Sequence, residues 1–475
     1  MSDSLEQKIE RIITSLCPYT GIEGQYGPPK SLYERLRATH TPGVSIAVIN
    51  DFEIEWARGF GLSEAGTQNK VGTETLFQAA SISKPIFALA VMKMVQIGQL
   101  DLDEDVNRYL YSWRVPKNED WQPRITLRQL LSHTAGTTVH GFPGYHASGA
   151  LPNLVQILNG EFPTNTPAIN VTLLPGTQYR YSGGGYTIAQ QVMMDKLGAP
   201  FPDIMREFNF ELLGLENSSY EQPLQPHWAA RAAAGHPWNG VPIQERYRIM
   251  PEMAAAGLWT TPTDLAKIGV ELMQVLEHRK PYALLNKESI LAMFKPQLSD
   301  QGEGISEYVG LGFHCNGVGD NFSFSHEGLN EGFIAAMYVF PYLGKGAVIM
   351  INSNEGGCFL TELLRSIGKE YAWPWLSLHD KKFKSTLDLD DFTGYYSWKS
   401  PSDLMMSIDR GHLMFHPLGQ QPPFPVFPRT AGKDPEFFAK AVNLSLKFER
   451  DETGNVIALI LYQEDGRYSK AEKQN

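Results

Sequence analysis

A serine and a lysine three residues apart, in the segment Ser81-Ile82-Ser83-Lys84, have the types and spacing for nucleophilic chemistry. Residues three apart on a helix share a face, so the Lys84 amine can reach the Ser81 hydroxyl. A serine hydroxyl needs a neighbouring base, and lysine can serve where burial favours its neutral form. The apolar run 86–95 offers such burial, and the start of a helix favours an oxyanion. The alternative is a helix-capping serine beside a solvated lysine.

Other segments accompany this SxxK motif along the chain. They are TLRQLLSHTAG at 126–136, PGTQYRYSGGGY at 175–186, GLWTTPTDLAK at 257–267 and FSHEGLNEGF at 324–333. The ordered set resembles the serine β-lactamase and penicillin-binding-protein-like hydrolase family, in its class C, esterase and D-aminopeptidase branch. The resemblance spans about residues 35–370. It implies a β-lactamase/transpeptidase-like α+β fold and a catalytic serine hydrolase.

The resemblance also implies roles for particular residues. Ser81 would be the acylated nucleophile, Lys84 its activating neighbour, and Tyr181 a general acid and base that accepts and returns the serine proton. The backbone N–H groups of Ser81 and Leu329 would form the oxyanion hole. Gly328 suits a strand edge that substrate approaches closely, and His326 would face the pocket and position substrate.

Two departures from the family pattern bear on the substrate. Gly183 stands where the family commonly has asparagine, and His326 stands where β-lactamases and DD-peptidases usually place lysine. A histidine is mostly neutral near pH 7, so the anchor for a substrate carboxylate is weakened. We therefore expect hydrolysis of peptide or amide bonds, as in D-aminopeptidases. The alternatives are a carboxylesterase with weak β-lactamase activity and a non-catalytic, penicillin-binding-like sensor module.

Other chemistry-bearing residues have simpler interpretations. His133 in the SHTAG segment reads as a structural loop residue, and the acidic stretch 101–105 reads as a solvated cluster. Cys17, Cys315 and Cys358 are far apart, with no CxxC or HExxH motif, so the sequence predicts neither disulfides nor a metal site. No GxSxG pentapeptide supports an α/β-hydrolase. The predicted reaction needs no metal and no organic cofactor.

Charge and hydropathy limit the partners. The formal net charge of −11 disfavours nucleic acid and anionic membranes, and the short basic run at 381–384 does not offset it. The N-terminus lacks the basic start and apolar core of a signal peptide, and no apolar run reaches the length of a transmembrane helix. We expect a cytoplasmic enzyme acting on a small molecule or peptide, and self-association into a homo-oligomer stays open.

The elements that must position these residues follow from the sequence pattern. Residues 5–16 predict an amphipathic surface helix, and residues 43–50 and 53–60 predict a hairpin. Residues 81–97 predict a buried helix, with Pro85 in its first turn and Gly98 as its C-terminal cap. Further strands are predicted at 308–314, 321–326, 332–340 and 346–352. Strands at both ends of a helical middle indicate one antiparallel sheet.

A change in composition divides the chain. We predict a β-lactamase-like hydrolase domain over 1–376, a charged linker at 377–385 and a small domain over 386–475. The last segment shows short strands separated by turn signals at 409–411, 451–454 and 465–466, and Leu444, Leu446 and Phe448 alternate with polar residues. It is expected to form a small antiparallel β-barrel of the lipocalin-like kind.

Overall fold

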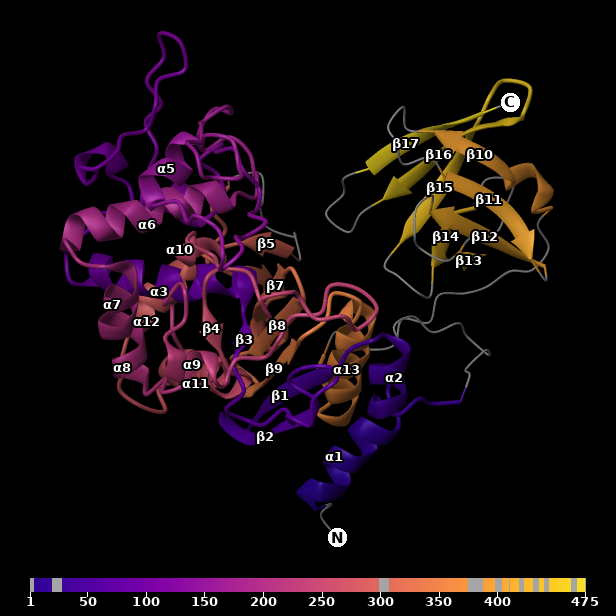
Figure 1. The fold of residues 1–475 in the computed structure, drawn as a ribbon, viewed down its shortest axis with the longest axis horizontal. Coiled ribbons are helices and arrows are strands. Elements are labelled where there is room, and N and C mark those ends of the chain that lie inside the picture. Colours follow the sequence, from indigo (N-terminus) through magenta and orange to yellow (C-terminus); the bar gives the residue numbers. More distant parts are fainter. Residues whose placement is uncertain are drawn as a thin grey trace. The chain divides into compact units, whose positions relative to one another are not determined.

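The computed structural model describes most of the chain in two compact units (Figure 1). The described residues are 4–18, 28–298, 307–374, 388–397, 404–409, 411–417, 423–429, 435–439, 444–462 and 468–474. One unit comprises residues 33–360, and the other combines residues 1–32 with residues 361–475. The proposed linker at 377–385 lies outside the described residues, so the domain boundaries remain predictions.

The 33–360 unit is built on a seven-stranded antiparallel sheet, in the order β2-β1-β9-β8-β7-β6-β5. Its strands are β1 (Gly43–Asn50), β2 (Glu53–Gly61), β5 (Glu307–Val309), β6 (His314–Asn316), β7 (Ser323–Asn330), β8 (Phe333–Phe340) and β9 (Lys345–Ile351). A separate pair joins β3 (Phe77–Gln78) to β4 (Trp259–Thr260). Strands from both ends of the unit therefore meet in one sheet, which confirms the α+β prediction.

The predicted hairpin is confirmed, and its turn has an unusual sequence. Asp51 and Phe52 join β1 to β2 with φ values of 50° and 65°. Such turns favour Asn-Gly or Asp-Gly, because both central residues need positive φ. Phe52 is held instead by tertiary contacts: its N–H donates to Gly344 O, and the Arg279 guanidinium lies 3.5 Å from the centre of its ring.

One strand prediction was wrong. Residues 308–314 contain the end of β5, a loop at 310–313 and the first residue of β6, and the two short strands pair with each other across this loop. The loop contains Gly310 and Gly312. A Cβ atom at Gly310 would lie 2.0 Å from Met293 O, and Gly312 adopts a φ of 89°. Close packing and a left-handed backbone interrupt the strand here, although its apolar pattern continues.

Helices cover this sheet, and many are short. They are α2 (Leu32–Ala38), α3 (Ser83–Gln96), α4 (Leu127–Leu131), α5 (Leu154–Asn159), α6 (Gly183–Leu197), α7 (Phe201–Met205), α8 (Glu211–Leu213), α9 (Pro226–Ala229), α10 (Met253–Ala256), α11 (Pro262–Leu276) and α12 (Lys287–Met293). Single turns η1 (Ala80–Ile82), η2 (Val106–Arg108), η3 (Arg206–Phe210) and η4 (Gly319–Asn321) connect some of them. Helix α11 packs against β1 and β9, whereas α3 is buried among other helices.

The predicted helix at 81–97 is mostly correct. Helix α3 begins at Ser83, and a separate 3-10 turn, η1, precedes it. Pro85 lies in the first turn, where its missing N–H costs no hydrogen bond. Gly98 adopts a φ of 71°, and its N–H donates to Val95 O, which confirms its role in ending the helix.

The other unit contains two terminal helices and a barrel. Helix α1 (Leu5–Thr14) is capped by Ser4 and Gln7 and buries Ile9 and Ile12, as expected for an amphipathic helix. Helix α13 (Gly357–Glu370) crosses the boundary between the units, and Arg11 forms an ion pair with its Glu370 at 2.5 Å. None of the helices in the described segments is long and apolar enough to cross a bilayer.

Eight antiparallel strands close the C-terminal barrel, β10 to β17. They are β10 (Gly394–Ser397), β11 (Leu404–Asp409), β12 (His412–Pro417), β13 (Phe424–Pro428), β14 (Phe437–Ala439), β15 (Ser445–Arg450), β16 (Val456–Tyr462) and β17 (Tyr468–Lys473), preceded by η5 (Asp390–Phe392). Leu446 and Phe448 of β15 point into the core, and Lys447 is exposed, as the alternating pattern predicts. The predicted turn at 451–454 joins β15 to β16, whereas residues 465–466 lie outside the described residues.

Candidate active site

Ser81 and Lys84 lie where η1 passes into α3. Lys84 Nζ donates to Ser81 Oγ over 3.0 Å and to the carbonyl of Ala255, in α10, over 2.8 Å. The lysine is 2% exposed, and in the described residues it forms no ion pair with a carboxylate. Ala80, immediately before the serine, adopts a φ of 49°, a strained conformation of the kind found at functional sites. The arrangement brings a buried amine within hydrogen-bond distance of a partly exposed serine hydroxyl.

Ser83 has a different role from Ser81. Its side chain is fully buried, donates to Ala80 O over 2.5 Å and accepts the Leu258 N–H over 2.9 Å. Both contacts hold the backbone beside η1. Ser81 is partly exposed, so it is the hydroxyl of this segment that a substrate can reach.

Tyr181 lies immediately before α6, and its ring faces Lys84. Lys84 Nζ is 4.9 Å from the centre of the Tyr181 ring. Ser182 begins the helix as its N-cap: its Oγ accepts the Gly185 N–H over 3.1 Å and donates to Thr138 O over 2.7 Å. The tyrosine is therefore fixed by a helix start, and the three residues predicted to be catalytic come together.

Strand β7 lies against the segment that contains Ser81. His326, Gly328 and Asn330 are buried, whereas Glu327 and Leu329 point outward. A Cβ atom at Gly328 would lie 2.1 Å from the carbonyl oxygen of Ala79 and 3.1 Å from Ser81 N. Only glycine lets β7 approach the Ala79–Ser81 segment this closely, which gives a physical reason for a glycine at position 328.

Several histidines surround this site. The His326 ring centre lies 6.5 Å from that of Tyr181 and 5.1 Å from that of His314. Burial lowers the pKa of His326 well below its ordinary value, and His314 and Lys84 lower it further. Its Nδ1 lies 2.6 Å from Glu327 O, and a carbonyl only accepts, so Nδ1 carries the proton of the neutral ring. The Nε2 lone pair of His326 is therefore an acceptor.

The space beside Gly183 is already filled. A Cβ atom there would lie 2.9 Å from the Phe142 ring and 3.2 Å from His140 O. An aromatic ring thus occupies the direction that a side chain at position 183 would take. Nothing in the neighbourhood of Phe142 along the chain links it to Gly183, so this contact could not be predicted from the sequence.

A buried carboxyl, Glu252, precedes α10 and was also missed. It is fully buried, its Oε1 accepts from Tyr145 OH over 3.4 Å, and its Oε2 has no hydrogen-bond partner among the described residues. Burial raises its pKa to about 7. It lies three residues before Ala255, whose carbonyl accepts from Lys84. A single glutamate between Pro251 and Met253 carries no sequence signal for this environment.

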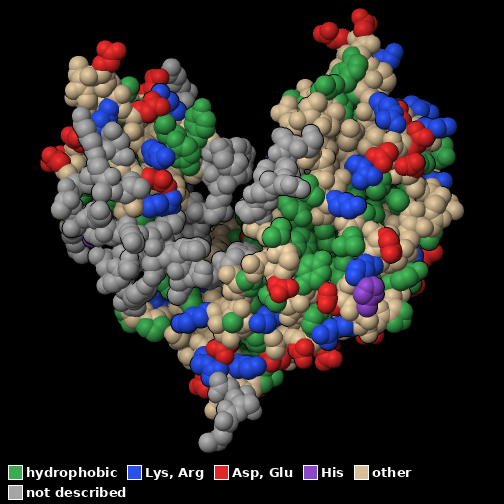
Figure 2. All heavy atoms as spheres, turned by 180° about the vertical axis from the view of Figure 1, so that it is seen from behind, with side chains coloured by type: hydrophobic (Ala, Val, Ile, Leu, Met, Phe, Trp, Pro, Cys, Tyr) green, Lys and Arg blue, Asp and Glu red, His purple; other side chains and the backbone are tan. Residues whose placement is uncertain are grey.

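Other polar clusters have different arrangements. In the barrel, Ser407 Oγ lies 2.6 Å from His416 Nε2, with the two residues on neighbouring strands. Asp103 binds Arg128 and Glu104 binds Arg108, so the acidic stretch at 101–105 is engaged with arginines. The three cysteines are free thiols. On the face shown in Figure 2, acidic and basic side chains are interspersed. Within the described ranges, no group of three or more His, Cys, Asp or Glu side chains has a metal-binding arrangement.

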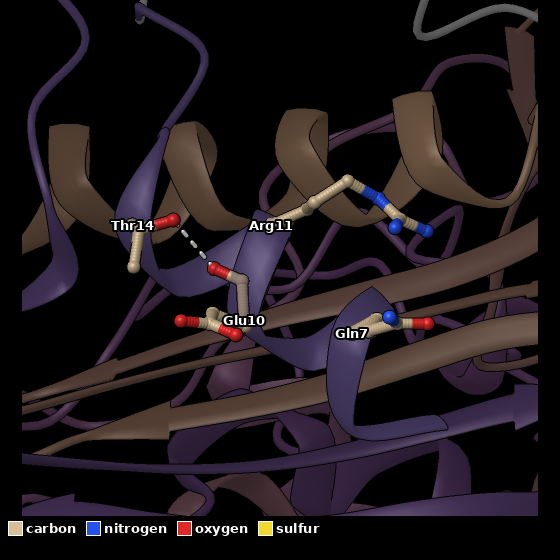
Figure 3. A pocket seen from close by; sticks show the side chains of 4 residues that line it. All are labelled: Gln7, Glu10, Arg11 and Thr14. Atoms are coloured by element: carbon tan, nitrogen blue, oxygen red, sulfur yellow. Dashed lines mark hydrogen bonds between the residues drawn. The ribbon is translucent and has the colours of Figure 1, made fainter. Parts of the chain in front are cut away.

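A surface hollow on α1 lies outside this site. Gln7, Glu10, Arg11 and Thr14 line it, and Thr14 Oγ1 donates to Glu10 O over 2.7 Å (Figure 3). The hollow is open and holds no hydroxyl paired with a base. We therefore place the candidate active site at Ser81.

Comparison with known proteins identifies the family of this chain. The Beta-lactamase family model matches residues 30–368. Protein flp of Staphylococcus aureus (strain N315) is 23% identical over 334 residues, which are 69% of this chain and 62% of flp. Esterase EstB of Burkholderia gladioli is 36% identical over 170 residues, which are 35% of this chain and 42% of EstB.

The fold is shared with solved structures. The octameric penicillin-binding protein homologue from Pyrococcus abyssi superposes with a TM-score of 0.61 at 20% identity, covering 93% of this chain and 98% of that one. The family match covers more than half of the chain and includes Ser81, Lys84, Tyr181 and His326. The chain therefore belongs to the β-lactamase family.

Proposed function

We propose that this protein is a serine hydrolase that forms an acyl-enzyme on Ser81 and cleaves amide or peptide bonds, as D-aminopeptidases do. The observation that carries the proposal is the 3.0 Å hydrogen bond from the buried Lys84 amine to the Ser81 hydroxyl, beside the Tyr181 ring. In this scheme the Tyr181 and Lys84 pair takes the serine proton as Oγ attacks the substrate carbonyl. The same proton then passes to the leaving amine, and water attacks the ester in a second, equivalent cycle.

The oxyanion is assigned to two backbone N–H groups, those of Ser81 and Leu329. Gly328 brings the strand that carries Leu329 against the Ala79–Ser81 backbone, which supports this assignment. Leu329 is 67% exposed, so substrate can reach this part of the strand. Gly183 contributes backbone rather than a side chain, and the Phe142 ring makes its surroundings apolar.

The edge of β7 supports a peptide-like substrate. Pairing of β7 with β6 ends at Ser325, whereas pairing with β8 continues to Asn330. In the described structure, residues 327–330 therefore pair with a strand on one side only. An extended peptide can add to such an edge through backbone hydrogen bonds.

Two observations bear on the alternatives. The 36% identity to Esterase EstB over 170 residues favours carboxylesterase activity as the second candidate. The lowered pKa of His326, caused first by its burial, keeps this ring uncharged at neutral pH. An uncharged ring is a poor anchor for a β-lactam carboxylate, so any β-lactamase activity should be weak. A sensor module would acylate without turning over.

One panel of chromogenic substrates tests the proposal. It compares a p-nitrophenyl ester, D- and L-amino-acid p-nitroanilides and a chromogenic cephalosporin, with wild type beside Ser81→Ala. Turnover of anilides that Ser81→Ala abolishes is the expected result, and turnover of the ester alone would assign the protein to the esterases. Fast cephalosporin cleavage would contradict the argument from His326 and Gly183.

Ser83→Ala is the matched control for the nucleophile. Its hydroxyl holds backbone only, so the variant should lose about 1–2 kcal/mol of stability but still form the Ser81 acyl-enzyme, detected by intact mass. Full turnover by Ser81→Ala, with loss in Ser83→Ala, would overturn the assignment. A separate measurement concerns self-association. Because the Pyrococcus abyssi protein is an octamer, light scattering should be used to measure the oligomeric state of this chain.

A further inference from the structure

His133 contacts three consecutive residues around Tyr181. Its carbonyl accepts the Arg180 N–H over 2.8 Å, and its Nδ1 accepts the Ser182 N–H over 3.1 Å. Its ring lies against that of Tyr181, with the centres 4.2 Å apart and the planes inclined by 30°. Contacts before, at and after Tyr181 restrict both the backbone and the ring of this residue.

The segment from His133 to His140 is shaped around these contacts. His133, Gly136 and Val139 have φ values of 59°, 68° and 63°, and such a value is unfavourable for a β-branched valine. The carbonyls of residues 138–140 accept hydrogen bonds from residues 182–184 at the start of α6. Strained backbone conformations persist only where contacts with the rest of the structure hold them. Here the contacts with residues 180–184 hold the strained loop.

The contact with Ser182 determines the protonation state of His133. A backbone N–H can only donate, so Nδ1 must present its lone pair, and the proton of the neutral ring lies on Nε2. A protonated ring would have a donor at both nitrogens and would lose this hydrogen bond. The side chain is 4% exposed, so water cannot readily replace the lost partner.

We propose that His133 is a positioning residue for Tyr181: its neutral ring holds the phenol beside Lys84, and protonation of the ring releases it. The inference rests on the proposed function, because the position of Tyr181 matters for activity only if Tyr181 transfers the serine proton. His133 itself touches neither Ser81 nor the proposed oxyanion groups in the contacts described above.

Charged and titratable groups face His133 from several elements. They are Lys84 of α3, His140 of the same loop, His314 of β6, His326 of β7 and the rings of Tyr179, Tyr181 and Tyr186. Burial lowers the pKa of His133 well below its ordinary value, and Lys84, His326, His314 and His140 lower it further. The ring is therefore neutral at pH 7 and gains a proton only in acid.

Two substitutions separate its contributions. Asparagine tolerates positive φ, and its side-chain oxygen can replace Nδ1 as the acceptor, so His133→Asn keeps the hydrogen bond but removes the ring and its titration. His133→Phe keeps a ring against Tyr181 but leaves the Ser182 N–H without its acceptor. His278 has a φ of 53° and is exposed, so His278→Asn and His278→Phe are matched controls.

The first readout is ester hydrolysis over a range of pH. We expect His133→Phe to lower kcat at least about tenfold with KM changed much less, because the lost contact positions a proton-transfer group. His133→Asn should lose less activity, and its acid limb of kcat should move to lower pH. Both His278 controls should match wild type. Unchanged kcat in His133→Phe, or an unmoved acid limb in His133→Asn, would overturn the proposal.

The second readout does not need turnover, so it separates this inference from the proposed function. Nitrogen NMR of 15N-histidine-labelled wild type, with His133 assigned by its absence in His133→Asn, should show a neutral ring protonated at Nε2 at pH 7. A proton on Nδ1, or a cationic ring at that pH, would overturn the inference even if hydrolysis is found. Where His133→Phe fails to fold, His133→Asn and this spectrum decide.

Discussion

The site in the 33–360 unit and the C-terminal barrel are built on opposite principles. Around Ser81 the protein buries ionisable and polar side chains: Lys84, His133, Glu252, His326 and Asn330. In the described strands of the barrel, the buried side chains are apolar or aromatic, such as Tyr396, Leu446 and Phe448. The single buried hydroxyl there, that of Tyr396, donates to Phe392 O over 3.0 Å.

This difference separates chemistry from stability. Burying a polar group costs free energy unless hydrogen bonds compensate for it, whereas apolar burial stabilises by about 25 cal/mol per Å². Stability therefore does not explain why so many polar side chains are buried around Ser81. The hydrogen bond from Lys84 to Ser81 offers a chemical explanation. Substitutions in the two regions should therefore affect different observables, and the following predictions test that separation.

The largest expected effect is on activity at Lys84. Lys84→Met removes the amine but keeps much of the side-chain volume, so we expect kcat/KM to fall about 10³-fold. The free energy of unfolding, measured in urea, should not fall, because an apolar side chain replaces a buried amine that has no carboxylate partner among the described residues.

Lys93→Met is the control on the same helix. Lys93 Nζ donates to Leu284 O and has no role in the proposed chemistry, so kcat/KM should stay within about twofold of wild type. A loss below tenfold in Lys84→Met, or an equal loss in Lys93→Met, would contradict the role of the Ser81–Lys84 pair.

The next effect belongs to the barrel. Leu446→Ala opens a cavity in a core that Leu446 shares with Phe437 and Phe448, and should lower barrel stability by about 2–5 kcal/mol. Hydrogen exchange of the barrel strands measures that loss, and ester hydrolysis at 25 °C should be unchanged. Lys447→Ala, on the exposed face of the same strand, is the control. A fall in kcat that parallels the stability loss would break the comparison.

Gly328→Ala should affect both observables together. Its new methyl group would lie 2.1 Å from Ala79 O, and backbone cannot move aside as a flexible side chain can. We expect about 1–3 kcal/mol of strain and a tenfold to hundredfold loss of kcat/KM, because the Ser81 segment must shift. Gly72→Ala, where the nearest atom would be 4.0 Å away, should be neutral in both assays.

The smallest effect is a pH dependence at Glu252. Burial raises its pKa to about 7, above the ordinary value of 4.5, so the folded state holds a proton that the unfolded state releases between these values. Its contribution to stability therefore falls as pH rises through this window. Glu252→Gln should be more stable than wild type by about 1–2 kcal/mol at pH 8 and similar to wild type at pH 4.

The buried histidines also make stability depend on pH, so the effect of Glu252 must be taken as the difference between wild type and Glu252→Gln. Burial lowers the pKa values of His133, His314 and His326, so their contributions fall as pH drops below the ordinary histidine pKa. They are common to wild type and Glu252→Gln, and the difference between the two unfolding curves isolates Glu252. Glu288→Gln, at an exposed position, is the control. An advantage that does not grow with pH would contradict the assignment.

Much of the fold was predictable because its signals are local. The hairpin, the buried helix that ends at Gly98 and the alternation along β15 follow from patterns within about ten residues. The division of 308–314 into β5 and β6 was not predictable, because the contact of Gly310 with the Met293 carbonyl comes from elsewhere in the chain. The start of α3 at Ser83 depends likewise on the bond of its hydroxyl to Leu258.

The same distinction applies to the site. Ser81 and Lys84 lie one helical turn apart, so their hydrogen bond could be inferred from spacing. Tyr181, His326 and Gly328 were assigned through family motifs, and the sequence itself held no distance between them. His133 was expected to be structural, and its position against Tyr181 shows what it supports.

The sequence alone determined the pairing of the Ser81 hydroxyl with the Lys84 amine, the order of the motifs, the α+β class and the presence of a C-terminal β-domain. Each depends on residue type and short-range periodicity, which secondary structure converts directly into geometry. Only the tertiary structure decided the hold of His133 on Tyr181, the closeness of Gly328 to the Ser81 backbone, the Phe142 ring beside Gly183 and the burial of Glu252. These features join residues far apart in the chain, and their energies arise from packing and exclusion of water, which exist only once the chain has folded.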